Sequence, residues 1–75
     1  MFSKQIFSER LIGLRKASNI SQSSLAKQIG INRTAITHME RAERAASIEV
    51  LYALADFFDV SLDYLVGRSD NPARN

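Results

Sequence analysis

The sequence has no cysteine and no tryptophan, and only one proline, three glycines and one histidine among its 75 residues. Without cysteine the chain can form no disulfide, zinc-thiolate site or thiol nucleophile, and one histidine cannot build a metal site alone. Few glycines and prolines, together with 45% hydrophobic residues, exclude collagen-like and low-complexity chains. A chain of this size has room for one domain with a small core.

Long hydrophobic runs are also missing. The stretch 50–55 is far shorter than the roughly 20 apolar residues of a membrane span, and no signal-peptide pattern is present. There is no glycine-rich phosphate loop and no spaced set of carboxylates and histidines, so we expect no enzyme activity, cofactor or metal. Neither a membrane nor a small-molecule ligand is expected as a partner, and the expected location is the cytoplasm.

The charged residues are segregated along the chain. Residues 1–44 contain eight basic and three acidic side chains, a net charge of +5, whereas residues 45–75 contain two basic and five acidic ones, a net charge of −3. A basic half joined to an acidic half is typical of a polyanion-binding face whose acidic remainder points away from the phosphates. Charge alone does not separate this interpretation from an ordinary solvated surface.

The hydrophobic spacing predicts an all-α chain of five helices, because no stretch alternates as a β-strand does. The first helix begins near Ser3, and the fourth is broken at 59–61. The expected N-caps of the other four helices are Ser21, Asn32, Ser47 and Ser61. The expected inward side chains are Phe7, Leu11, Leu14, Leu25, Ala26, Ile29, Ile36, Met39, Leu51, Leu54, Ala55, Phe58, Leu62 and Leu65.

The second and third helices are short, and the turn between them contains Gly30. Two short helices joined by such a turn are the signature of a helix-turn-helix. The run from 21 to 40, SQSSLAKQIGINRTAITHME, resembles the helix-turn-helix of the phage repressor family, also called lambda-repressor-like or xenobiotic-response-element type. The resemblance continues upstream and downstream and covers about residues 7 to 67.

The resemblance implies a compact five-helix DNA-binding domain over residues 1–67, whose third helix enters the DNA major groove. Residues 68–75 have no apolar anchor, and we expect a mobile C-terminal tail there. The family usually has glycine after the third helix and proline before the fourth, where this chain has Ala42 and Ala46. We therefore expect Ala42 either to avoid a positive φ, with a longer third helix, or to hold about 1 kcal/mol of strain.

In a helix-turn-helix, the N-terminal half of the recognition helix faces the base edges. The side chains expected to contact bases are Arg33, Thr34, Thr37 and His38. Arg33 can pair with guanine O6 and N7 in a bidentate manner, although binding a phosphate is the alternative. The threonines can offer a hydroxyl and a methyl group, but threonine is also common on helix surfaces. His38 can bind a base or a phosphate, or can simply be exposed to solvent.

Other side chains are expected to contact the DNA backbone: Gln22, Asn32, Lys27, Arg41 and Arg44. Gln22 begins the second helix, where its amide and the helix N-terminus can hold a phosphate oxygen, and the resemblance implies the same role. Asn32 has a second role as an N-cap, and ordinary solvated charge is the alternative for the three cations. The resemblance also implies a structural ion pair between Arg15 and Glu40 that joins the first and third helices.

One small domain reads few base pairs, so a homodimer on a pseudo-palindromic operator is the economical arrangement. The expected dimer interface residues are Tyr64, Val66 and Phe57, which could instead thicken the core. The favoured function is that of a sequence-specific, double-stranded DNA-binding transcriptional regulator. We expect a repressor, prokaryotic or phage-encoded and nucleoid-associated when bound. The alternative is an antitoxin-like or other protein-interaction module whose DNA binding depends on a partner.

Overall fold

The computed structural model describes residues 2–74, and within them all regular structure is helical. The helices are α1 (Lys4–Ala17), α2 (Gln22–Ile29), α3 (Arg33–Glu40), α4 (Ile48–Phe58) and α5 (Leu62–Leu65). The prediction of five helices is confirmed. Residues 1 and 75, the outer ends of the predicted domain and tail, lie outside the described range.

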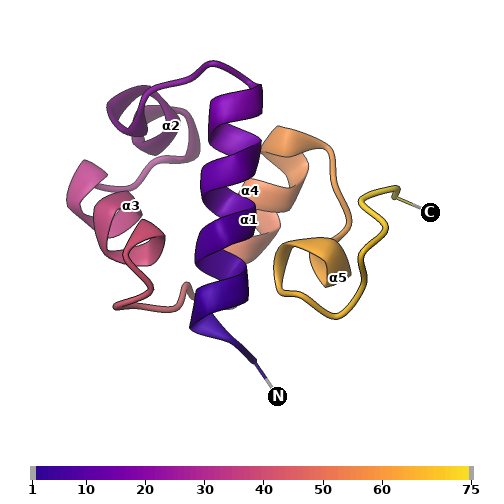
Figure 1. The fold of residues 1–75 in the computed structure, drawn as a ribbon. Helices are drawn as coiled ribbons and strands as arrows, with labels where there is room; N and C mark the ends of the chain where they lie inside the picture. The colour runs from indigo at the N-terminus through magenta and orange to yellow at the C-terminus, as the bar shows by residue number, and fades with distance from the viewer. Residues whose placement is uncertain (1, 75) are drawn as a thin grey trace.

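The five helices form a bundle around α1 (Figure 1). In this view α1 runs through the middle of the molecule, α2 and α3 lie on one side of it, and α5 lies on the other, with α4 behind. The described C-terminal residues run beside α5, away from α2 and α3. The helix-turn-helix is therefore at one end of the molecule, and the C-terminal segment is at the opposite end.

Serine side chains cap four of the five helices at their N-termini. In each case the hydroxyl accepts a hydrogen bond from the backbone N–H three residues later, a group that the helix itself leaves unpaired. The capping serines are Ser3, Ser21, Ser47 and Ser61. The predicted caps at 21, 47 and 61 are confirmed, and each fixes where its helix begins.

Asn32 occupies the N-cap position of α3, but its side chain makes no capping hydrogen bond. The prediction of a side-chain cap is thus wrong, and the reason lies in the backbone. The N–H of Ala35 donates to the carbonyl oxygen of Asn32 at 3.0 Å, which pairs the group that the side chain would have taken. The Asn32 side chain is exposed.

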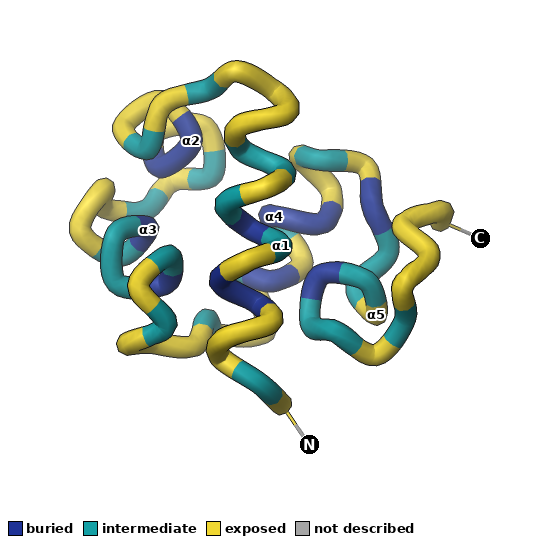
Figure 2. The backbone as a smooth tube through the Cα atoms, viewed as in Figure 1, coloured by how far each residue is buried: buried dark blue, intermediate teal, exposed yellow. Residues whose placement is uncertain are grey.

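The core lies where α1, α2, α3, α4 and α5 face one another (Figure 2). Its fully buried large side chains are Phe7, Leu11, Leu25, Ile36, Leu54 and Leu65. Each was predicted from helical spacing, and the prediction is confirmed. Leu14, Ile29, Phe58 and Leu62 pack against this core but are only partly buried. Together the buried side chains fix α2 and α3 against α1 and α4.

The chain leaves α3 through Ala42, which has a left-handed backbone with φ 58°. Its N–H donates to the carbonyl of Met39 at 3.1 Å, and the N–H of Glu43 donates to that of His38 at 3.0 Å. These two bonds close the helix end in the way a C-terminal glycine usually does. Of the two alternatives for this turn, the strained one occurs, and α3 ends at Glu40 rather than running on.

The described part of the C-terminal segment, residues 68–74, is held to the helices by polar contacts. Arg10 of α1 donates to the carbonyl oxygens of Tyr64 and Ser69, each at 2.9 Å, and pairs with Asp70 at 2.8 Å. Farther along, the N–H of Ser61 donates to the carbonyl of Pro72 at 3.0 Å. We expected a mobile tail because residues 68–75 contain no apolar anchor. The spacing of hydrophobic residues gives no information on polar contacts such as these.

None of the helices in the described residues combines the length and the hydrophobicity that a bilayer crossing demands. The longest, α1, has 14 residues, and polar side chains occupy much of its surface. A membrane-spanning helix of about 20 apolar residues is thus not among them.

Candidate nucleic-acid interface

The helix-turn-helix consists of α2, a sharp turn at Gly30 and α3. Gly30 has φ 77° and ends α2 in the left-handed conformation that glycine adopts at little cost. The turn lets the next helix start at once, and α3 buries Ile36 and Met39 on its inner side. Because those two side chains fix its orientation, the opposite face of α3 points to solvent.

The predicted base-contacting residues lie on this outer part of α3. Arg33 and Thr34, in its first turn, are exposed, whereas Thr37 and His38, one turn later, are half-buried. Among the described residues, the side chains of Arg33 and Thr34 make no hydrogen bond. The first turn of α3 therefore offers a free guanidinium and a free hydroxyl to a ligand.

Thr37 and His38 are held by neighbours. The Thr37 hydroxyl lies 3.1 Å from Oε1 of Gln22 and 3.2 Å from the carbonyl oxygen of Arg33, and it can donate to either. His38 Nδ1 lies 2.8 Å from a carboxylate oxygen of Glu43. A carboxylate accepts a hydrogen bond, so the Nδ1 proton faces Glu43 and Nε2 faces away from it.

A half-buried polar network joins α1, α2 and α3. Arg15 donates through Nε to Oε2 of Glu40 at 2.6 Å and through Nη2 to Oε1 at 3.1 Å, so the two side chains pair in a fork. Gln22 donates through Nε2 to Oε1 of the same carboxylate at 2.9 Å. The side chains of Arg15 and Glu40 are 16% and 6% exposed. Most of the water is therefore excluded from this ion pair. The ion pair links α3 to α1 and so to the rest of the domain.

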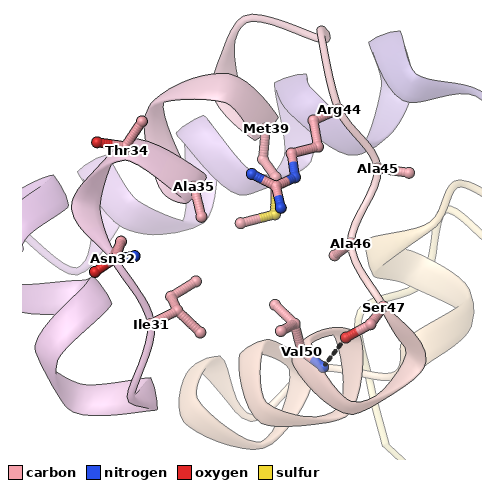
Figure 3. A pocket seen from close by; sticks show the side chains of 10 residues that line it. All are labelled: Ile31, Asn32, Thr34, Ala35, Met39, Arg44, Ala45, Ala46, Ser47 and Val50. Atoms are coloured by element: carbon pink, nitrogen blue, oxygen red, sulfur yellow. Dashed lines mark hydrogen bonds between the residues drawn. The ribbon is translucent and has the colours of Figure 1, made fainter.

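The residues predicted to contact the DNA backbone surround this face. Lys27, Asn32, Arg41 and Arg44 are exposed, and Gln22 is half-buried. Asn32 and Arg44 also line a hollow between α3 and the start of α4, shown in Figure 3. The apolar part of its lining includes Ile31, Ala35, Met39 and Val50. Arg44 reaches from the loop toward this hollow, which Met39 of α3 also lines.

Of the three residues predicted at the dimer interface, Tyr64 and Val66 lie in or directly after α5, on the side of α1 away from α2 and α3, and both are engaged within the chain. The guanidinium of Arg10 lies 4.0 Å above the ring of Tyr64, and Val66 packs partly buried against the core. Phe57 is 39% exposed and meets Phe58 edge to face, with ring centroids 5.1 Å apart. Of the three, Phe57 thus keeps the largest free apolar surface.

Sequence reasoning missed the two internal partners of Gln22. It gave Gln22 a phosphate and Thr37 a base, but the amide also joins Glu40, 18 residues away, to Thr37, 15 residues away. No local spacing rule relates residues so far apart. Sequence reasoning also missed the contact between His38 and Glu43. These residues are five positions apart and lie on either side of the end of α3, where the spacing rules of a helix no longer apply.

Known proteins match both the sequence and the fold. A family described as helix-turn-helix matches residues 11–65. The chain is 34% identical over 67 residues to the HTH-type transcriptional regulator YobD of Bacillus subtilis, with 89% of this chain and 60% of YobD covered. It is 40% identical over 60 residues to the cryptic phage CTXphi transcriptional repressor RstR of Vibrio cholerae, with 80% of this chain and 54% of RstR covered.

A solved structure extends the comparison to the fold. The P22 c2 repressor protein in complex with synthetic operator 9T superposes with a TM-score of 0.81 at 35% identity, and the match covers 87% of this chain and 98% of that one. The chain spans a little more than half the length of the two curated relatives YobD and RstR. The match with the helix-turn-helix family takes in most of this chain, from the middle of α1 to the end of α5, and the chain belongs to that family.

Proposed function

We propose that the protein is a sequence-specific, double-stranded DNA-binding transcriptional regulator that acts as a repressor. The observation that carries this proposal is the outer face of α3, where an exposed arginine and threonine stand free while the inner face is fixed in the core. The P22 c2 repressor, whose structure with a synthetic operator has the same fold, supports it. The protein would work by binding rather than by catalysis.

In this proposal α3 lies in the major groove with its first turn toward the bases. Arg33 pairs with guanine O6 and N7, Thr34 contacts a neighbouring base, and Thr37 and His38 reach the bases one turn later. Lys27, Arg41 and Arg44 neutralise phosphates around the groove, and the N-terminus of α2 with Gln22 holds a phosphate oxygen. The exposed Asn32 amide lies within the same ring of backbone contacts.

We propose further that two copies bind a pseudo-palindromic operator as a homodimer. One recognition helix covers few base pairs, and pairing two of them about one helical turn apart supplies the missing affinity and specificity. The proposed interface consists of the exposed Phe57 near the end of α4, together with Tyr64 of α5 and Val66 directly after it. Because α5 lies on the side of α1 away from α2 and α3 (Figure 1), an interface there leaves the recognition helix free. The working location is the cytoplasm, at the nucleoid.

The test is selection of bound sequences from a randomised double-stranded DNA pool at two salt concentrations, followed by sequencing. We expect a two-fold symmetric motif with half-sites about one helical turn apart, and weaker retention at the higher salt. An enriched motif without symmetry would contradict the homodimer and leave DNA recognition standing. No retention at low salt would contradict DNA binding and favour the protein-interaction alternative.

A further inference from the structure

We propose that Thr37 reads DNA as a hydrogen-bond acceptor and contacts the exocyclic amino group of adenine or cytosine in the major groove. The inference rests on the proposed DNA-binding function. A threonine hydroxyl can normally either donate or accept, so it does not by itself discriminate between base edges. In this protein the direction of its hydrogen bond is fixed from inside by a series of contacts that begins at Arg15.

The first contact in the series has only one possible direction. A guanidinium can only donate, and Arg15 donates twice to Glu40, so the Glu40 carboxylate is a pure acceptor. The amide of Gln22 must then turn its Nε2 toward Glu40, where the distance is 2.9 Å. The flipped amide would place two acceptor oxygens against each other in a site with little water, which is costly.

With Nε2 turned toward Glu40, Oε1 of Gln22 faces Thr37 at 3.1 Å and can only accept. The second partner of the hydroxyl, the carbonyl oxygen of Arg33 at 3.2 Å, is also a pure acceptor. The single hydroxyl proton of Thr37 therefore points into the protein whichever partner it takes. What remains for an outside ligand is the oxygen lone pairs.

An acceptor in the major groove pairs with adenine N6 or cytosine N4, because guanine O6 and N7 and thymine O4 are acceptors themselves. Thr37 lies on α3 one turn after Arg33 and is half-buried, so its oxygen can reach a base that lies against the helix. Thr34 has no such internal partner among the described residues and remains free to donate. Thr34 can therefore pair with a donor or with an acceptor, whereas Thr37 would pair with a donor only.

The experiment begins with the motif selected by the natural protein and by Thr37→Val and Thr37→Ser. Valine keeps the shape and removes the hydroxyl, whereas serine keeps the hydroxyl and is the matched control. We expect T37V to lose sequence preference at one position of each half-site and T37S to keep it. Circular dichroism melting verifies that both variants fold, and Thr37→Ala replaces T37V if valine does not.

Base analogues then determine which group is read at that position. Purine in place of adenine, or the matching cytosine analogue without N4, removes the amino group. 7-Deazaadenine, or 7-deazaguanine opposite a cytosine, keeps the amino group and removes the N7 acceptor of the base pair instead. We expect loss of the amino group to weaken DNA binding of the natural protein about 3- to 10-fold. DNA binding of T37V should weaken only by the amount that the analogue costs any protein on this site. Loss of N7 should affect both proteins equally.

Three results would overturn the inference. If T37V selects the same motif as the natural protein, Thr37 reads no base. If the natural protein is sensitive at this position to loss of N7 and not of the amino group, Thr37 donates rather than accepts. If the natural protein enriches no sequence at all, the proposed DNA-binding function fails first and the inference fails with it, a result distinct from the other two.

Discussion

At the scale of single residues, Ala42 is the most strained position with a clear cause. Its φ of 58° brings its β-carbon close to the backbone, at a cost of about 1 to 2 kcal/mol that glycine avoids. Glycine also loses more entropy on folding, which offsets part of the gain. We therefore expect Ala42→Gly to raise the free energy of unfolding by about 0.5 to 1 kcal/mol in urea denaturation.

Asn19 supplies the control for this prediction. It has nearly the same backbone, with φ 54°, but asparagine tolerates the left-handed region better than alanine. Asn19→Gly should change the free energy of unfolding by less than about 0.5 kcal/mol. Equal gains from both substitutions would mean that the strain at Ala42 has relaxed elsewhere and that the turn costs nothing special.

Glu40 is the residue whose charge matters most to stability. Glu40→Gln keeps the shape of the side chain but leaves the guanidinium of Arg15, 16% exposed, without its carboxylate. Because a mostly buried cation then lacks its counter-charge, we expect a loss of about 2 to 3 kcal/mol in the free energy of unfolding, measured in urea.

Asp70→Asn is the matched control, because Asp70 pairs with Arg10 but is 99% exposed. An exposed pair is screened by water, so the loss should stay below about 1 kcal/mol. If E40Q were no more destabilising than D70N, the ion pair between Arg15 and Glu40 would contribute no more to stability than an exposed pair. It would then not be the contact that holds the Gln22 amide in its orientation.

At the scale of the helices, much of the fold could be predicted because its signals are local. Four serine hydroxyls mark where helices begin, and a repeat of three and four residues marks which faces enter the core. The outer face of α3 follows directly, since burying Ile36 and Met39 leaves Arg33 outside. These features need no knowledge of tertiary structure.

The contacts that could not be predicted from hydrophobic spacing depend on how the helices pack against one another. The hydrogen bonds that join Gln22 with Glu40 and with Thr37, and those from Arg10 to the C-terminal segment, connect residues 15 to 60 positions apart. Such contacts exist only once the core has set the helix orientations. The exposed face of α3 could therefore be predicted from the sequence, whereas the hydrogen-bond network behind it could not. The direction of each hydrogen bond became clear only from the structure.

The contact between α1 and α5 depends on Gly67. Its φ is 86°, and a β-carbon there would lie 2.6 Å from Cγ2 of Ile6, closer than two carbons can pack. Gly67→Ala should therefore cost both backbone strain and a clash, at least about 1 kcal/mol more than strain alone. Thermal and urea unfolding would measure the difference.

Gly30→Ala isolates the strain, because Gly30 has a similar φ of 77° and open space around the new β-carbon. The clash can also be removed directly. In an Ile6→Ala background, the cost of G67A should fall toward that of G30A, since the colliding methyl group is gone and only the β-carbon of residue 6, 3.3 Å away, remains close. A cost that stays the same in that background would show that the clash plays no part.

At the scale of the whole molecule, the basic side chains of α2, α3 and the following loop lie apart from the acidic side chains near α5, where Arg10 is the basic residue that pairs with Asp70. Lys27, Arg33 and Arg41 belong to α2, α3 and the loop that follows, on one side of α1, whereas Asp63 and Asp70 lie with α5 on the other (Figure 1). A net charge of +2 conceals this separation. The resulting field would orient the protein with α3 toward a polyanion before any contact forms.

This layout predicts which cations set the salt dependence of DNA binding. A basic side chain that neutralises a phosphate releases a counterion when DNA binds. Its removal therefore reduces the magnitude of the negative slope of log K against log salt by about 1 for each bound protomer. We expect this from Arg41→Gln and from Arg44→Gln, both exposed beside α3. The slopes would be measured by fluorescence anisotropy on the selected operator between low and physiological salt.

Arg74→Gln is the control at the opposite end. Arg74 hydrogen-bonds Asp56 at 2.7 Å, a contact that raises the pKa of the guanidinium above its ordinary value, and Asp59 lies 3.6 Å away. Its charge is already matched by carboxylates of the acidic half, so its removal should leave the slope unchanged. Should R74Q reduce the magnitude of the slope as much as R41Q, the DNA would not be confined to the α3 end, and the orientation implied by the charge separation would be wrong.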